Sequence, residues 1–180
     1  MKGLPNSPDN VRVATEADEA KLFDLLMALY KDNNFGIPPR PMDVRQEIRA
    51  GTREKNGVLI AVIDGDEETL AGSVCITPLT WWYNKAPEMF YLNELWLFVR
   101  PEYRRHTTYF NDLFETMNAY KALMDETMGR DVPLVTGALS RKRLPAKMRL
   151  WGRYAQMVGG VFVCDGRTGP RGEQKAGGMQ

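Results

Sequence analysis

The stretch from Phe90 to Met128 constrains the fold more than any other, because an apolar run passes through a short basic turn into a long helical pattern. The run FYLNELWLFV is apolar on both alternating faces, which is typical of a central strand covered on each side. Pro101 cannot donate a hydrogen bond to a sheet and should end this strand. Apolar residues then recur at three- and four-residue spacing up to Gly129, which predicts one amphipathic helix with a glycine stop.

The strand itself should contribute to the core on both faces of the sheet. Strict alternation divides its apolar side chains into two sets, with Leu92, Trp96 and Phe98 on one face and Leu95, Leu97 and Val99 on the other. Asn93 and Glu94 are the polar exceptions. Helices are therefore expected on both sides of the sheet.

The turn RPEYRRHTT combines positive charge with the start of a helix. It contains Arg104, Arg105 and His106, and Thr107 or Thr108 can cap the first helical turn. Free backbone N–H groups at a helix N-terminus, together with positive charge, favour anions. The turn is a candidate anion site, and the alternative is a solvated basic turn with a capping threonine.

Composition places the chain among globular proteins of one domain. It has 180 residues, of which 43% are apolar, enough for one core. The 24 basic and 23 acidic residues leave a net charge near +1, which argues against nucleic-acid binding. Apolar runs are shorter than the ~20 residues that cross a bilayer, and the two cysteines lack the spacing of a metal site. We therefore expect a reduced, cytoplasmic protein without a membrane partner or a metal.

Patterns on either side of the central unit complete an α/β (α+β) domain with a mixed, mostly antiparallel sheet flanked by helices. The predicted order is β-α-α-β-β-β-α-β-α-β. Strands are expected at 11–13, 58–63, 70–78, 90–99, 132–139 and 158–163. The first helix is expected to start at a capping box of Thr15 and Asp18, and the second to cover 43–50 and end at Gly51. The other two helices are expected from the basic turn to Gly129 and at 146–154. Residues 1–165 form one domain. Residues 166–180 are a polar, glycine-rich tail that is flexible or ordered by a partner.

The segment V-R-P-E-Y-R-R resembles the core motif of the GNAT superfamily of N-acetyltransferases, roughly V-x-P-x-x-R/Q-x-x-G-x-G/A. With Pro101 aligned, Arg104 takes the Arg/Gln position, and Thr107 and Tyr109 stand where the family has two glycines. The order of elements also resembles the GNAT layout. In the family this loop wraps the pyrophosphate of acetyl-CoA. The resemblance therefore implies acetyl-CoA as cofactor, with its contacts at Phe98, Val99, Arg104, Arg105, His106, Thr107 and Thr108.

The resemblance also implies a general base and an acid. Glu94 lies on the central strand among apolar neighbours, where a carboxylate could accept a proton from an amine; the alternative is an ion pair with an arginine. A tyrosine in the last helix protonates the leaving thiolate in many family members, and Tyr154 is the candidate here, although packing would also explain it. Trp81, Trp82 and Tyr83 could form a substrate wall or a partner contact, or pack on the sheet.

Two functions are compatible with these observations. The first is a GNAT-like acyltransferase that moves an acetyl group from acetyl-CoA to an amine of a small molecule or a protein. The second is a catalytically inactive GNAT-fold binding or structural protein with a protein assembly partner, since both family glycines are replaced. The short layout and altered loop resemble divergent bacteriophage-encoded GNAT-like proteins. That resemblance implies a location in the host cytoplasm or in a virion.

Overall fold

A computed structural model describes residues 4–33, 38–54, 57–66, 68–81, 86, 89–106 and 108–136. Within them, a five-stranded sheet has the order β1-β2-β3-β4-β5. The first four strands pair antiparallel and the last pair is parallel, which confirms the predicted mixed sheet. The strands are β1 (Arg12–Val13), β2 (Leu59–Asp64), β3 (Leu70–Thr80), β4 (Phe90–Val99) and β5 (Leu134–Val135).

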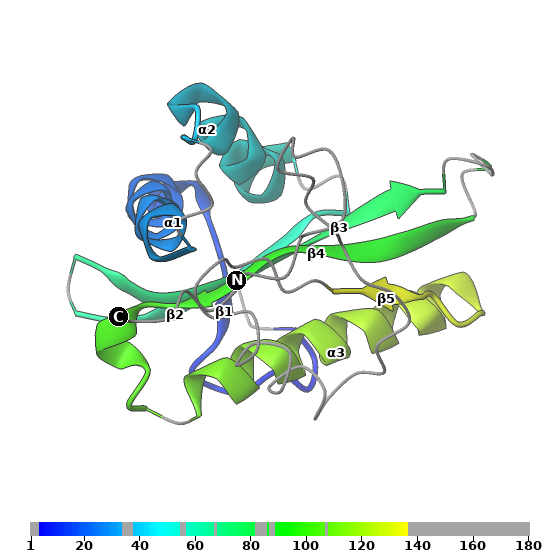
Figure 1. Cartoon of the computed structure of the whole chain (residues 1–180). Coiled ribbons are helices and arrows are strands. Elements are labelled where there is room, and N and C mark those ends of the chain that lie inside the picture. Colours follow the sequence, from blue (N-terminus) through cyan, green and yellow to red (C-terminus); the bar gives the residue numbers. More distant parts are fainter. Residues whose placement is uncertain are drawn as a thin grey trace, which may run out of the picture.

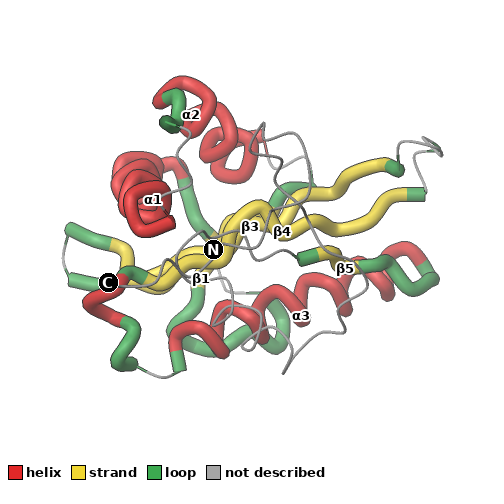
Figure 2. The backbone as a smooth tube through the Cα atoms, viewed as in Figure 1, coloured by secondary structure: helices red, strands yellow, loops and turns green. Residues whose placement is uncertain are grey.

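Helices cover both faces of the sheet, as predicted. Helices α1 (Glu19–Asn33) and α2 (Pro41–Arg49) lie on one face, and α3 (Tyr109–Met128) runs along the other (Figures 1 and 2). Gly129 ends α3 in the left-handed conformation, with φ of 62°, which confirms the predicted glycine stop. The expected helix at 146–154, the expected strand at 158–163 and the tail lie outside the described residues.

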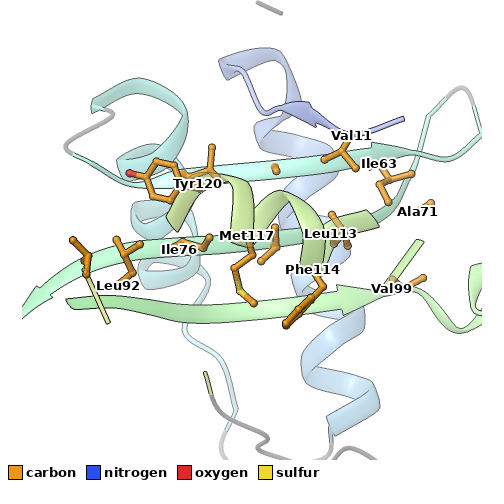
Figure 3. Close-up of a cluster of buried hydrophobic side chains, with 14 residues drawn as sticks. Val11, Ile63, Ala71, Ile76, Leu92, Val99, Leu113, Phe114, Met117 and Tyr120 are labelled. Atoms are coloured by element: carbon orange, nitrogen blue, oxygen red, sulfur yellow. The ribbon is translucent and has the colours of Figure 1, made fainter. Parts of the chain in front are cut away.

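Two layers of buried side chains hold the helices to the sheet. On the α3 face, Leu113 and Met117 of the helix pack against Ile76 and Leu92 of the strands (Figure 3). On the other face, a second cluster joins α1 and α2 to β2 and β4: Leu22, Leu25, Leu26, Val44, Ile48, Ile60, Trp96 and Phe98 belong to it. β4 lies between β3 and β5 and contributes to both clusters, so it is an interior strand covered on both faces, as the sequence predicted.

A β-bulge in β4 changes which face its residues occupy. Trp96 pairs with Cys75 and Glu94 pairs with Ile76, so Leu95 has no Cα partner on β3. A bulge adds one residue to one strand and interrupts its alternation. Leu92 consequently packs on the α3 face, whereas Trp96 and Phe98 pack on the α1–α2 face. The prediction that these three side chains share a face was wrong, and Leu95 is 41% exposed.

Glycine 51 does not end the second helix. After Pro41–Arg49 the chain continues as a π-helical segment, Ala50–Glu54. A Cβ at position 51 would overlap the side chain of Ile60 on β2. The sequence pattern predicted a stop at this glycine, but the residue instead allows the π-helical segment to lie close against the sheet.

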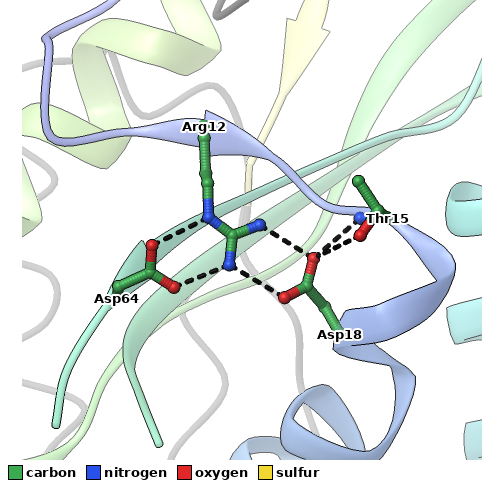
Figure 4. Close-up of polar contacts among 4 residues, drawn as sticks. All are labelled: Arg12, Thr15, Asp18 and Asp64. Atoms are coloured by element: carbon green, nitrogen blue, oxygen red, sulfur yellow. Dashed lines mark hydrogen bonds and ion pairs between the residues drawn. The ribbon is translucent and has the colours of Figure 1, made fainter. Parts of the chain in front are cut away.

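A group of charged side chains fixes the beginning of the chain to the sheet (Figure 4). Arg12 on β1 donates two hydrogen bonds of 2.8 Å to Asp18 and two more, of 2.8 and 2.6 Å, to Asp64 at the end of β2. Asp18 also accepts a 2.8 Å hydrogen bond from the backbone N–H of Thr15. That bond confirms the predicted helix start at Thr15 and Asp18.

These contacts predict an acid-sensitive contribution to stability. Burial alone would raise the pKa of Asp18, but hydrogen bonds from Arg12 and Thr15 outweigh it and lower the pKa from 3.8 to about 2. A lowered pKa stabilises the fold above the unfolded value, and that contribution disappears as pH falls through the folded value. We expect a loss of about 2 kcal/mol in the free energy of unfolding between pH 4 and pH 2 from this group.

Urea denaturation at a series of pH values would measure this loss. Asp18→Asn should lower the stability at pH 7 and show a smaller decrease on acidification. Asp64→Asn is the matched control, because Asp64 binds the same arginine but its side chain is 57% exposed. An equally steep acid profile in wild type and Asp18→Asn would contradict the assignment.

Candidate functional site

The crossing from β4 to α3 is a compact turn held by backbone hydrogen bonds. β4 ends at Val99, and a 3-10 turn, Pro101–Tyr103, follows it, as the proline predicted. The N–H of His106 donates to the Tyr103 carbonyl at 3.0 Å. Thr108 precedes α3 but makes no side-chain capping bond, so the prediction that it caps the helix was wrong for this residue. Thr107 lies outside the described residues.

Arg104 points back from this turn onto the α1–α2 side of the protein. Its Nη2 donates a 2.7 Å hydrogen bond to Oδ2 of Asp32, and its Nε donates a 2.9 Å hydrogen bond to the carbonyl of Val99. The guanidinium carbon also lies 5.4 Å from the centre of the Phe98 ring. The motif arginine is therefore engaged by the protein itself. These contacts differ from those expected of an arginine whose guanidinium group is free to bind a phosphate.

Aromatic rings occupy the part of the turn where the family motif has small residues. The ring of His106 stacks on that of Tyr109, with centroids 5.1 Å apart. Tyr109 also packs against the core cluster of the α3 face, and Tyr103 lies 6.5 Å from both rings. The hydroxyl of Tyr103 accepts a 3.1 Å hydrogen bond from the backbone N–H of Asp66, in the β2–β3 turn. Arg105 and His106 are exposed beside this cluster.

The carboxylate of Glu94 lies on β4, next to the bulge. Its Oε2 accepts a 2.7 Å hydrogen bond from the hydroxyl of Thr136, the residue after β5. The parallel ladder pairs Leu92 with Leu134 and Asn93 with Val135, which brings Glu94 and Thr136 level on neighbouring strands. The contact between Thr136 and Glu94 was not predicted, because no local pattern shows which residue of a parallel neighbour will lie opposite.

Some of the remaining predicted site residues lie in the core, and others lie outside the described residues. Phe98 and Val99 are 4% and 7% exposed and belong to the two core clusters, so a ligand would reach them mainly through their backbone. The rings of Trp81 and Tyr91 are in contact, with centroids 4.3 Å apart and planes tilted by 33°. Trp82, Tyr83 and Tyr154 lie outside the described residues.

The structure thus places two kinds of chemistry along one strand. A carboxylate stands near the middle of β4, and a basic turn with the N-terminus of α3 stands at its end. Glu94 and Val99 pair with Ile76 and Gly72, which are four positions apart on β3, so roughly 13 Å of strand separates them. A single ligand that contacts both would have to be long, with an anionic end at the turn and its reacting end beside Glu94.

Two classes of site receive no support from the described part of the chain. In it, no three histidine, cysteine, aspartate or glutamate side chains gather as a metal ion would require. The helices described there also include none that combines the length and the apolar character of a membrane span.

Comparison with known proteins identifies the fold. Neither models of protein families nor curated protein sequences match the chain. Solved structures do match, at low sequence identity. The aminoglycoside 6'-N-acetyltransferase AAC(6')-Ih from Acinetobacter baumannii has a TM-score of 0.60 at 14% identity, covering 86% of this chain and 96% of its own.

Other acetyltransferases give similar values. A possible acetyltransferase from Clostridium difficile 630 has a TM-score of 0.60 at 16% identity, over 85% of this chain and 93% of its own. The ribosomal-protein-alanine N-acetyltransferase from Brucella melitensis biovar Abortus 2308 has a TM-score of 0.58 at 12% identity, over 86% and 95%. These neighbours give no support to a bacteriophage origin. They agree with the resemblance seen in the sequence, and the chain has the fold of the GNAT acetyltransferases.

Proposed function

We propose that the protein transfers an acetyl group from acetyl-CoA to an amine. The observation that carries this proposal is the placement of Glu94 and Thr136 beside the bulge of β4, roughly 13 Å along the strand from the basic turn. Acetyl-CoA is a long ligand with phosphates at one end and a thioester at the other, so its chemistry matches this separation. The GNAT fold of the chain supports the same assignment.

In this proposal Glu94 acts as the general base. An amine is a nucleophile only when it is neutral, so an ammonium group must first give a proton to a carboxylate, directly or through water. The neutral nitrogen then attacks the thioester carbonyl, a C–N bond forms, the C–S bond breaks, and the nitrogen gives its second proton to water. The thiolate of CoA takes up a proton as it leaves, and Tyr154 is the proposed donor. Thr136 orients the Glu94 carboxylate by its 2.7 Å hydrogen bond.

The basic turn would hold the phosphates in this reaction. Arg105 and His106 are exposed there, and the turn precedes the N-terminus of α3, whose partial positive charge favours anions. Arg104 is engaged with Asp32 and contributes mainly to the shape of the turn. The exposed basic side chains and the N-terminus of α3 are therefore the proposed phosphate contacts, since the N–H groups of Tyr103, Arg104 and His106 already donate to backbone carbonyls.

One observation favours the alternative of a GNAT-fold protein without catalysis. The ring of Tyr109 is packed against the core and stacked on His106, at the position where the family motif has a small residue that lets the cofactor approach. Such a protein would keep the fold and bind a partner without transferring an acetyl group. The two functions differ first in whether acetyl-CoA binds.

Isothermal calorimetry with acetyl-CoA separates the two functions. We expect the wild-type protein to bind acetyl-CoA with a Kd below 1 mM, about −4 kcal/mol or stronger. Release of free CoA thiol should follow when a suitable amine is added. An aminoglycoside and a peptide with an N-terminal alanine are suitable first acceptors, since neighbours named for these two classes share the fold. Absence of binding at millimolar acetyl-CoA would contradict the proposed enzyme.

A further inference from the structure

We propose that Asp32 and Arg104 form a clasp that positions the basic turn for the cofactor, with Asp32 as a positioning residue. The inference rests on the proposed function and adds to it a residue that no sequence motif marks. The two side chains are 72 positions apart in the sequence and meet at 2.7 Å between Nη2 and Oδ2. They join the C-terminal end of α1 to the turn that leads from β4 into α3.

The geometry of Arg104 is that of a fixed side chain. Three contacts hold its guanidinium group: the carboxylate of Asp32, the carbonyl of Val99 and the face of the Phe98 ring. The side chains of Arg104 and Asp32 are 31% and 16% exposed, so water screens the pair only in part. A partly buried, charge-assisted hydrogen bond is stronger than one on the open surface.

The position of Asp32 explains why the pair matters to the turn. Asp32 lies in the last turn of α1, where the helix dipole disfavours a negative charge. The cation of Arg104 offsets that effect, so the carboxylate and the turn hold each other in place. Lys31 is the basic residue of that last turn, and Asp32 forms an ion pair with Arg104 across the sequence.

A second anchor holds the same turn. The hydroxyl of Tyr103, the residue before Arg104, accepts a hydrogen bond from the N–H of Asp66 and lies 3.3 Å from the hydroxyl oxygen of Thr69. Two successive side chains therefore tie the turn to α1 and to the β2–β3 turn. A turn held in this way loses less freedom when it binds an anion, which favours binding.

Substitution of the two partners distinguishes a clasp from a direct phosphate ligand. If the clasp positions the turn, Asp32→Asn and Arg104→Ala should each raise the KM for acetyl-CoA by roughly tenfold, and the double variant should be no worse than either. The value of kcat at saturating acetyl-CoA should stay within about twofold, because the reacting groups on β4 are untouched. If Arg104 instead binds phosphate and Asp32 competes for it, Asp32→Asn should lower the KM. That result would overturn the proposal.

A control variant and a stability measurement test the clasp independently of the proposed function. Asp24→Asn makes the same change of charge on an exposed residue of the same helix and should leave both KM and thermal stability unchanged. Thermal unfolding of the protein without acetyl-CoA gives a second double-mutant cycle, in which the changes in Tm of the Asp32 and Arg104 variants are compared. Absence of acetyl-CoA binding by the wild type would refute the proposed enzymatic activity but not the contact between Asp32 and Arg104. Additive losses of Tm in the free protein would refute the clasp.

Discussion

Glu94→Gln should reduce kcat for acetyl transfer by about 10²–10⁴-fold and leave the Kd for acetyl-CoA within about twofold. The amide has the shape of the carboxylate, and its oxygen can still accept the hydrogen bond from Thr136, but it cannot take a proton from an ammonium group. The loss therefore falls on the chemical step. Steady-state kinetics at saturating acetyl-CoA would measure it, with calorimetry on the same variant to show that the cofactor still binds.

Thr136→Val serves as the matched control for the role of the neighbouring strand. It keeps the size of the side chain and removes the 2.7 Å hydrogen bond, so the base is present but less well oriented. We expect a decrease in kcat of about tenfold, smaller than that of Glu94→Gln. Equal activity of wild type and Glu94→Gln would mean that the carboxylate is only a structural partner of Thr136.

Leu113→Ala should lower the free energy of unfolding by about 2–5 kcal/mol, the range for truncation of a buried leucine. Leu113 is fully buried in the cluster between α3 and the sheet. Its Cδ1 would lie only 3.1 Å from a Cβ at Gly72, so helix and sheet are in close contact at this point. Little can move in to fill the space that the leucine leaves. Urea denaturation followed by circular dichroism would give the change.

Leu123→Ala is the control on the same helix. Its side chain is 36% exposed and lies away from the buried clusters, so we expect a change within about 0.5 kcal/mol. The comparison holds helix propensity constant, because both variants replace leucine with alanine in α3. A similar loss in the two variants would show that α3 is not stabilised mainly by the layer of side chains beneath it.

The unit of strand, turn and helix could be predicted because its signals are local. An apolar run, a proline, a three-to-four-residue period and a glycine stop each depend on residues close in sequence, and the structure has all of them from Phe90 to Gly129. The bulge could not be predicted. When both faces of a strand are apolar, one additional apolar residue such as Leu95 leaves no trace in the alternation.

The contacts around the candidate site could be predicted only in part, for a related reason. Glu94 stood out because a carboxylate in an apolar strand is conspicuous. Its partner Thr136 depends on the register of two parallel strands, and the Asp32–Arg104 pair joins segments far apart in the chain. Neither relation has a short-range signal in the sequence. The roles assigned to Tyr154 and Thr107 stay predictions, as both residues lie outside the described part of the chain.

Because of the bulge at Leu95, one residue could be deleted from β4 without loss of the fold. Loss of one codon inside a central strand normally turns the rest of that strand over, so that its core side chains face the wrong layer. Within β4, codon 95 is the exception. With Leu95 removed, Glu94 and Trp96 would still face Ile76 and Cys75, and the alternation would become regular. A chain without this residue could retain the GNAT fold, and comparison with it would separate the effect of Leu95 on the proposed acetyl transfer from the role of β4 in folding.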